Sequence, residues 1–148
     1  MDIYKVEKSE LYIVITMTDG SNTVGSVFLA PDSRLHDGPQ TLEEHLEEAG
    51  SFLKLKDAQE EFFLAGIEST AMICLMKSEV EAAEFVKRAP VKMKICGAGD
   101  LQGELVVPES HDAFRVSDYL NTDVVWLRVE TDDDIYMVRK PAVLEIYC

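Results

Sequence analysis

Two histidines stand beside aspartates at matching places in the chain, where a base and an orienting acid could serve catalysis. His36 precedes Asp37 and His111 precedes Asp112, and each pair follows a Pro-acid-Ser step. A histidine base held by a carboxylate activates a serine or cysteine when all three groups lie within hydrogen-bond reach. The sequence has no Gly-x-Ser-x-Gly pattern of a nucleophile elbow. Exposed loop residues explain the two His-Asp pairs equally well, so we predict no catalytic residue.

Metal and cofactor chemistry finds little support in the spacing of the acids and glycines. Glu130 is followed by the run Asp132-Asp-Asp134, but calcium loops space their acids at alternate positions and include a glycine. Three consecutive acids are typical of a solvated hairpin turn. Gly97-Ala-Gly99 leads into a predicted strand, whereas a phosphate-binding glycine loop leads into a helix. We therefore predict no metal ligand and no cofactor.

An Arg-apolar-x-Asp motif occurs twice, as Arg34 with Asp37 and as Arg115 with Asp118. In a structural interpretation, the acid begins a helix and the arginine pairs with a carboxylate or a strand-end carbonyl. In a functional interpretation, the motif is a recognition loop displayed twice. We favour the structural interpretation, because a repeat preserves rules of folding more readily than it preserves sites.

The motif belongs to a longer internal repeat. In each copy an alternating strand reaches a glycine-containing turn, and a second strand starts near a glycine and runs to Pro-acid-Ser. The alignment places Gly25 over Gly103, and Phe52–Leu55 over Trp126–Val129. A repeat of about seventy residues is near the lower limit for an independent core, so we expect the copies to pack on each other.

Alternation of apolar and polar residues predicts ten short strands with tight turns between them. They are expected at 11–17, 23–30, 51–56, 61–65, 71–76, 91–95, 101–107, 124–130, 135–139 and 143–147. Strands of this length in two sets of five predict a mainly β protein made of two tandem five-stranded antiparallel barrels.

Capping signals predict a few helices between these strands. Thr41-x-x-Glu44 is a capping box that opens a helix ending near Gly50, and Ser78-x-x-Glu81 opens another that Pro90 ends. The second copy has room for a turn or two at 117–120. The predicted organisation is therefore a first barrel at 1–77, a linker helix at 78–90 and a second barrel at 91–148.

The chain is strongly acidic, with 28 acidic residues against 14 basic ones and a formal net charge of −14. Both halves share the excess, so it does not come from an acidic tail. A charge of this sign repels phosphate backbones and anionic lipids, which predicts neither a nucleic acid nor a membrane as partner. No stretch has the roughly 20 apolar residues of a membrane span.

Two further features favour the cytoplasm. The first residues, Met1-Asp-Ile-Tyr-Lys-Val-Glu7, lack the basic and apolar regions of a secretory signal. The cysteines, Cys74, Cys96 and Cys148, are odd in number and share no metal-type spacing. A disulfide framework is therefore not expected, and a reducing compartment is the simplest location.

The order of parts resembles an SH3-like or Sm-like small barrel. The chain also resembles a family of small bacterial domains without assigned activity, which carry Thr-Asp-Gly, Pro-x-x-x-Arg-Leu-x-Asp and Phe-Leu-x-Leu. The matching residues are Thr18, Asp19, Gly20, Pro31, Arg34, Leu35, Asp37, Phe52, Leu53 and Leu55. Sm-like proteins that bind RNA carry a loop with an Asp and an Asn, and Asp32-Ser-Arg34 here lacks the Asn. The resemblance implies the barrel and carries no RNA binding with it.

Exposed apolar residues on strands indicate where a partner could bind. If Leu53 and Leu55 face inward, Phe52 faces outward, and the same alternation places Trp126 outside. The helices, the other repeat or a partner could cover these two aromatic rings, and we favour cover within the protein, because a chain of this length needs to bury both. The last strand has apolar residues on both faces, as in a strand covered on both sides. The candidate interaction residues are Phe52, Trp126, Leu144, Ile146 and Tyr147.

These observations predict a non-catalytic protein-interaction module that binds a protein partner or self-associates. The alternatives are an enzyme with a site at the interface between the repeats and, with less support, an Sm-like nucleic-acid binder.

Overall fold

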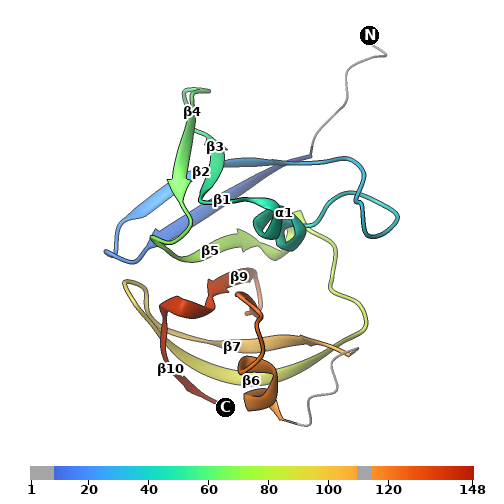
Figure 1. Ribbon diagram of the computed structural model, residues 1–148, viewed down its shortest axis with the longest axis vertical. Helices are drawn as coiled ribbons and strands as arrows, with labels where there is room; N and C mark the ends of the chain where they lie inside the picture. Colours follow the sequence, from blue (N-terminus) through green and yellow to red (C-terminus); the bar gives the residue numbers. More distant parts are fainter. Residues whose placement is uncertain (1–8, 110–114) are drawn as a thin grey trace. The chain divides into compact units, whose positions relative to one another are not determined.

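The computed structural model describes residues 9–109 and 115–148 of the 148-residue chain. In this part of the chain the protein is mainly β, as predicted (Figure 1). Its elements are β1 (Ser9–Met17), β2 (Asn22–Leu29), α1 (Leu42–Glu48), β3 (Phe52–Lys56), β4 (Phe62–Gly66), β5 (Thr70–Met76), the 3₁₀ turn η1 (Lys77–Glu79), β6 (Val86–Ile95), β7 (Gly99–Pro108), α2 (Val116–Leu120), β8 (Trp126–Glu130), β9 (Asp134–Arg139), the 3₁₀ turn η2 (Lys140–Ala142) and β10 (Val143–Tyr147).

The ten strands belong to one antiparallel sheet with the order β10-β6-β7-β8-β9-β5-β1-β2-β3-β4. The two end strands are therefore β10 and β4. Each of the ten predicted strands coincides with an observed one to within a few residues, except that β6 begins earlier.

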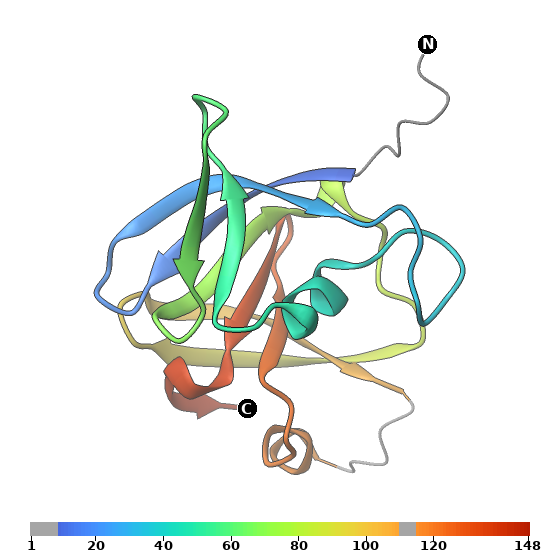
Figure 2. The same ribbon diagram turned by 45° about the horizontal axis from the view of Figure 1, so that its top comes forward.

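The described residues divide into two compact units that share β1 and β2. Residues 9–13 and 24–68 form the first unit, and residues 14–23, 69–109 and 115–148 form the second. Within the first unit, β3 and β4 form a hairpin and lie side by side (Figure 2). The buried apolar residues of this unit are Leu11, Ile13, Val27, Leu29, Leu42, Leu46, Leu53, Leu55 and Ala65.

The helix α1 begins as its sequence predicts. The Thr41 hydroxyl accepts a hydrogen bond from the Glu44 backbone N–H, and the Glu44 carboxylate accepts one from the Thr41 backbone N–H, which is a complete capping box. Leu42 and Leu46 share the buried face of the helix. The helix therefore covers the core with one apolar stripe.

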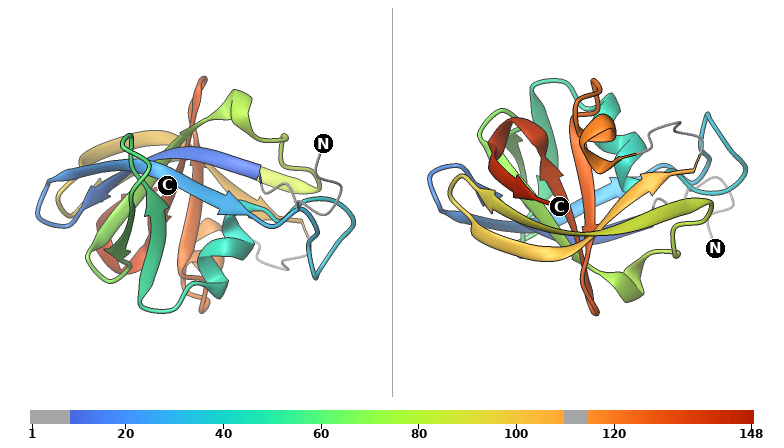
Figure 3. Two further views of the ribbon diagram at one scale, coloured as in Figure 1. Left: turned by 90° about the horizontal axis from the view of Figure 1, so that it is seen from above. Right: turned by 90° about the horizontal axis from the view of Figure 1, so that it is seen from below.

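In the second unit, β6 and β7 form a long hairpin whose strands run side by side (Figure 3). An apolar core cluster lies among the strands and α2. Its buried members are Ala71, Val91, Met93, Ile95, Leu101, Leu105, Val107, Tyr119, Leu127, Val129, Val138 and Ala142.

The predicted linker helix at 78–90 is wrong. Lys77–Glu79 forms one 3₁₀ turn, and β6 begins at Val86. A helix of this length with three apolar residues on one face is marginal by itself. Pairing with β7 instead gives the backbone a ladder partner from Val86 opposite Pro108 to Ile95 opposite Gly99. Pro90 is tolerated in this strand because the pairing of β10 with β6 stops at Lys92.

Candidate protein-interaction surface

The outer face of the β3–β4 hairpin carries large apolar side chains that the fold leaves exposed. Leu53 and Leu55 are buried, so Phe52, Lys54 and Lys56 lie on the opposite face of β3. The register places Leu64 opposite Lys54 and Phe62 opposite Lys56, on the same face. Phe52, Phe62 and Leu64 are all exposed. We call Phe28, Phe52, Lys54, Phe62 and Leu64 the hairpin patch.

Contacts among β2, β3 and β4 hold the rings of this patch in place. The centroids of Phe28 and Phe62 lie 6.3 Å apart with the ring planes tilted by 53°. The Lys54 ammonium lies 4.6 Å from the centroid of the Phe62 ring, and the Lys56 ammonium lies 5.1 Å from that of Phe28. Each such cation–π contact contributes about 0.5–1 kcal/mol at an exposed site. The patch is therefore partly preorganised for binding.

The two lysines of β3, Lys54 and Lys56, differ in their ion pairs. Lys56 forms ion pairs with Glu10 and Glu60, at 3.5 and 3.9 Å. Among the described residues, no carboxylate lies within ion-pair distance of Lys54. The patch thus presents aromatic rings and an ammonium group on an acidic protein.

The second set of exposed apolar residues lies on β10. Leu144 and Tyr147 are exposed, whereas Ile146 is half-buried and packs against the core of its unit. The Tyr147 hydroxyl donates a hydrogen bond to Glu145 Oε2 at 3.2 Å. The sequence predicts all three as interaction residues. Two of them, Leu144 and Tyr147, lie at the surface of an end strand.

Trp126 is covered within the protein, as the sequence favours, and so it is not available as the interaction residue that the sequence also predicts. It is 9% exposed, so it is part of the interior and not of an exposed surface. Four of the five residues of β8 are buried, so both faces of this strand are covered. Alternation predicts an outer face for the residue but does not reveal that this face is covered. Phe52, at the aligned position, is exposed.

The repeated Arg and Asp residues lie at the surface, in the segments before or at the start of the helices. Arg34 and Asp37 are exposed in the loop that precedes α1, and Arg115 and Asp118 are exposed at the start of α2. No ion pair joins the Arg to the Asp in either motif, both of which lie wholly within the described residues. The structure therefore gives these residues no shared site. His111 and Asp112 lie outside the described residues.

His36 belongs to a polar cluster that ties its loop to α1. Its Nε2 lies 2.5 Å from Glu44 Oε1, and its Nδ1 lies 2.9 Å from the Asp37 carbonyl oxygen. The Ser33 hydroxyl donates to Glu44 Oε2 at 2.6 Å. The serine and the histidine thus both bind the carboxylate, and the serine is not paired with the histidine as a nucleophile requires. This geometry anchors a loop.

The titration of this cluster follows from its hydrogen bonds. The Asp37 carbonyl first, and then Glu44, stabilise the protonated imidazole and raise the pKa of His36. The hydrogen bond from Ser33 is the largest cause that lowers the pKa of Glu44, and His36 and Thr41 add to it against a smaller opposing effect of burial. The pair is therefore most strongly joined when His36 is protonated.

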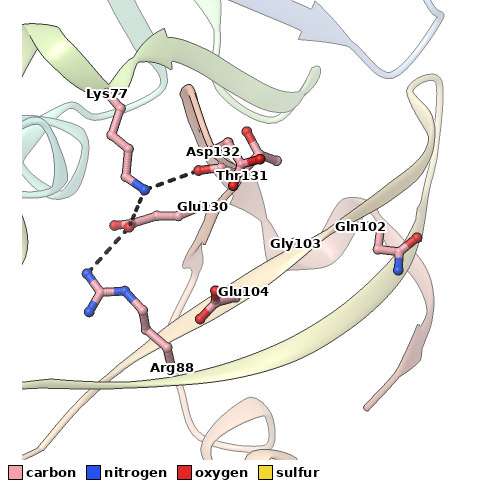
Figure 4. A pocket seen from close by; sticks show the side chains of 8 residues that line it. All are labelled: Lys77, Arg88, Gln102, Gly103, Glu104, Glu130, Thr131 and Asp132. Carbon is pink, nitrogen blue, oxygen red and sulfur yellow. Dashed lines mark hydrogen bonds and ion pairs between the residues drawn. The ribbon is translucent and has the colours of Figure 1, made fainter.

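A buried carboxylate, that of Glu130 at the end of β8, is surrounded by three cations. Figure 4 shows two of them, Lys77 and Arg88, pointing toward the carboxylate. Glu130 is 4% exposed. Its Oε2 accepts a hydrogen bond from Arg128 Nε at 2.8 Å, while Arg88 Nη2 and Lys77 Nζ lie 3.4 and 3.5 Å from its Oε1. Lys77 also donates to the Thr131 carbonyl at 3.1 Å. The cluster joins the end of β5, β6 and the β8–β9 turn.

In the sequence, Glu130 is notable only as a neighbour of Asp132-Asp-Asp134, where no metal site is predicted. The groups around the carboxylate are cations, which would repel a metal ion. In residues 9–109 and 115–148, no three His, Cys, Asp or Glu side chains are placed to hold one. Burial by itself raises the pKa of Glu130, but the hydrogen bond and charge of Arg128, with the charges of Arg88 and Lys77, outweigh it and lower the pKa.

The three cysteines are free thiols. Cys74 and Cys96 are half-buried and Cys148 is exposed. Burial, reinforced by the charge of Asp134, raises the pKa of Cys74, which keeps this thiol protonated and unreactive at neutral pH.

Comparison with models of protein families gives no match for this chain. Comparison with curated proteins gives none either, and no solved structure matches its fold. No helix in the described part of the chain is long and apolar enough to cross a membrane.

Proposed function

We propose that the chain consists of two small five-stranded barrels in tandem, within residues 1–77 and 91–148, which together act as a cytoplasmic, non-catalytic protein-interaction module. The hairpin patch, which extends to the end strand β4, carries this proposal.

The order of strands supports the tandem arrangement. In the run β5-β1-β2-β3-β4, the fifth strand of a set lies beside the first, followed by the second, third and fourth. The run β10-β6-β7-β8-β9 has the same order for the second set. A helix stands between the second and third strands in both sets, α1 in one and α2 in the other.

The registers of the strands support the alignment of residues between the two sets. Ser26 pairs with Lys56 next to Gly25, and Glu104 pairs with Glu130 next to Gly103. A Cβ built on Gly25 would lie 3.1 Å from the Lys56 carbonyl oxygen, and one built on Gly103 would lie 2.6 Å from that of Glu130. In both sets, a glycine thus lets the second strand bend closely over the third.

The function rests on what the end strand exposes. An end strand offers unpaired backbone N–H and C=O groups, and natural proteins usually shield such an edge with charge, a bulge or a cover. β4 instead presents Phe62 and Leu64 at the surface. Adding a partner strand to an exposed edge combines main-chain hydrogen bonds with apolar contacts to alternate side chains. The edge of β4 supplies the main-chain groups, and the hairpin patch supplies the apolar side chains.

Affinity capture with matched surface variants tests this function. We expect the wild-type chain to retain a protein, from its own cells or as a differently tagged second copy, that the double variant Phe62→Asp, Leu64→Asp does not retain. Leu35→Asp is the control, because Leu35 is also apolar and exposed but lies in the loop before α1. Retention of the same proteins by all three baits would contradict the proposal.

A further inference from the structure

We propose that the chain self-assembles by pairing β10 of one copy, antiparallel, with β4 of the next copy. The inference rests on the proposed function and names the partner of the hairpin patch. β10 and β4 are the two end strands of the sheet, and no strand among the described residues lies beyond either of them. Each therefore has one edge available to pair with the other end strand of a second copy.

The chain already contains the contact that serves as the template. β5, the fifth strand of the first set, pairs antiparallel with β9, the fourth strand of the second set. β10 is likewise the fifth strand of its set, and β4 is the fourth strand of its own. A second copy can therefore supply β10 to β4 in the same way that β5 is supplied to β9.

The exposure of apolar side chains differs between β4 and the equivalent strand β9. The registers align Phe62 and Leu64 of β4 with Ile135 and Met137 of β9. Ile135 and Met137 are 2% and 1% exposed beside β5, whereas Phe62 and Leu64 are 57% and 62% exposed. Large apolar residues occupy both pairs of positions. β9 has a strand on each side, whereas β4 has β3 on one side and no described strand on the other.

β10 shows the same contrast with β5. Met17 pairs with Thr70 and Ile95 pairs with Val143, and a register irregularity follows both pairs. In this alignment, Leu144 of β10 occupies the position that Ala71 occupies in β5. Ala71 is fully buried in β5, while Leu144 is 60% exposed in β10.

The template also gives the register of the contact. In the chain, Ile73 pairs with Met137 and Leu75 pairs with Ile135. Transferred to the end strands, Ile146 lies opposite Leu64 and Cys148 lies opposite Phe62. Residues directly opposite in an antiparallel pair have Cα atoms about 4.5–5.5 Å apart. This separation lies within the range of about 4.4–6.8 Å that a disulfide spans.

Oxidative cross-linking of the full chain tests this register. In Phe62→Cys, we expect a disulfide between the introduced thiol and Cys148, found in hybrid peptides when ¹⁴N-labelled and ¹⁵N-labelled proteins are mixed. Adding Cys148→Ser should abolish it. Val24→Cys is the control, since Val24 is exposed on β2, inside the sheet order. Cross-linking through position 62 that is no faster than through position 24 would overturn the register.

Light scattering tests the assembly without an introduced cysteine. We expect the mass of the wild-type protein to rise with concentration, and to rise more at 0.3 M salt than at low salt, because copies with a net charge of −14 repel each other. Leu64→Lys and Tyr147→Lys each change an exposed residue on one end strand, and circular dichroism checks that both variants fold. Either variant alone should be monomeric, and their mixture should stop at two copies, joined through the one intact pair of edges.

A monomeric wild-type protein at millimolar concentration in 0.3 M salt would overturn self-assembly. That result would leave the proposed function standing if capture of another protein still depended on Phe62 and Leu64. Loss of capture specificity together with a concentration-dependent mass would instead overturn the role of the hairpin patch.

Discussion

Gly103 of β7 lies against the backbone of Glu130 in β8, so that a Cβ built on the glycine would be 2.6 Å from the Glu130 carbonyl oxygen and 2.9 Å from Val129 Cγ1. Real Cβ atoms do not approach a backbone oxygen so closely, and the backbone cannot yield as the end of a flexible side chain can. The absence of a side chain at position 103 is therefore a condition for the approach of these two strands.

Gly103→Ala should destabilise the protein by about 1–3 kcal/mol, as other overpacking substitutions do. Gly25→Ala should cost less, since its nearest atoms lie at 3.1 Å. The measurement is urea unfolding at neutral pH. Gly50→Ala is the control, because a Cβ there would meet nothing within 4 Å. Equal stability of the position-103 variant and the control would contradict this prediction.

Glu130→Gln should destabilise the protein by about 1–4 kcal/mol at pH 7, because it leaves Arg128, Arg88 and Lys77 without their shared buried counter-charge. Glu104→Gln is the matched control, since Glu104 lies beside the same cluster without an ion pair to it within the described residues. Thermal unfolding of the three proteins measures the difference.

The effect of Glu130→Gln should depend on pH in a defined direction. The pKa of Glu130 in the folded protein is lower than the 4.5 of a free glutamate. Its charge therefore contributes stability that is fully present above pH 4.5 and is lost as the pH falls through the folded-state pKa. The melting temperatures of the wild type and the variant should converge below that pKa. A constant difference down to pH 2 would show that the charge is not the cause.

His36 should titrate above the 6.5 of a free histidine. The stability that its protonated form contributes is fully present below pH 6.5 and is lost as the pH rises through the folded-state pKa. Glu44→Gln keeps a capping residue at this position of α1 and removes the charge beside the imidazole. The pKa of His36, measured by NMR, should then move part of the way towards 6.5, because the Asp37 carbonyl remains. No change on substitution would exclude Glu44 as a cause.

The protein should not bind DNA or RNA at about 150 mM salt. Binding to phosphates requires several clustered Lys or Arg residues, and this chain distributes 14 of them among 28 acids. Fluorescence anisotropy with labelled single-stranded and double-stranded oligonucleotides measures the affinity. Micromolar binding with a steep salt dependence would contradict the prediction.

The sequence predicts the strands well because each strand has its own local pattern. Leu53 and Leu55 alternate with Lys54 and Lys56, and this alternation alone identifies the buried face of β3. The capping box at Thr41 is equally local. The segment at 78–90 was mispredicted because its local signals favour a helix, whereas the ladder with β7 that decides its structure comes from residues further along the chain.

The cluster around Glu130 could not be predicted from local sequence patterns, because its members are far apart in the chain. Arg88 and Glu130 are 42 residues apart, and they meet because β6, β7 and β8 are neighbours in the sheet. For Trp126, the alternation of apolar and polar residues in its strand is regular and predicts an outward side chain. Whether that side chain is covered depends on tertiary structure, and it is 9% exposed. A prediction of strand order would have been needed for both.

The division of β1 and β2 between the two units has a consequence for dissecting the protein. The chain passes from one unit to the other at residues 13–14, 23–24 and 68–69, so neither unit is a continuous segment. Residues 14–23 are bound to the rest of the second unit by Thr18, whose N–H donates to the Ser69 carbonyl and whose own carbonyl accepts from the Cys96 thiol. A single proteolytic cut or gene truncation therefore cannot excise one unit intact, and a transplantable cassette would have to include the whole hairpin of β1 and β2.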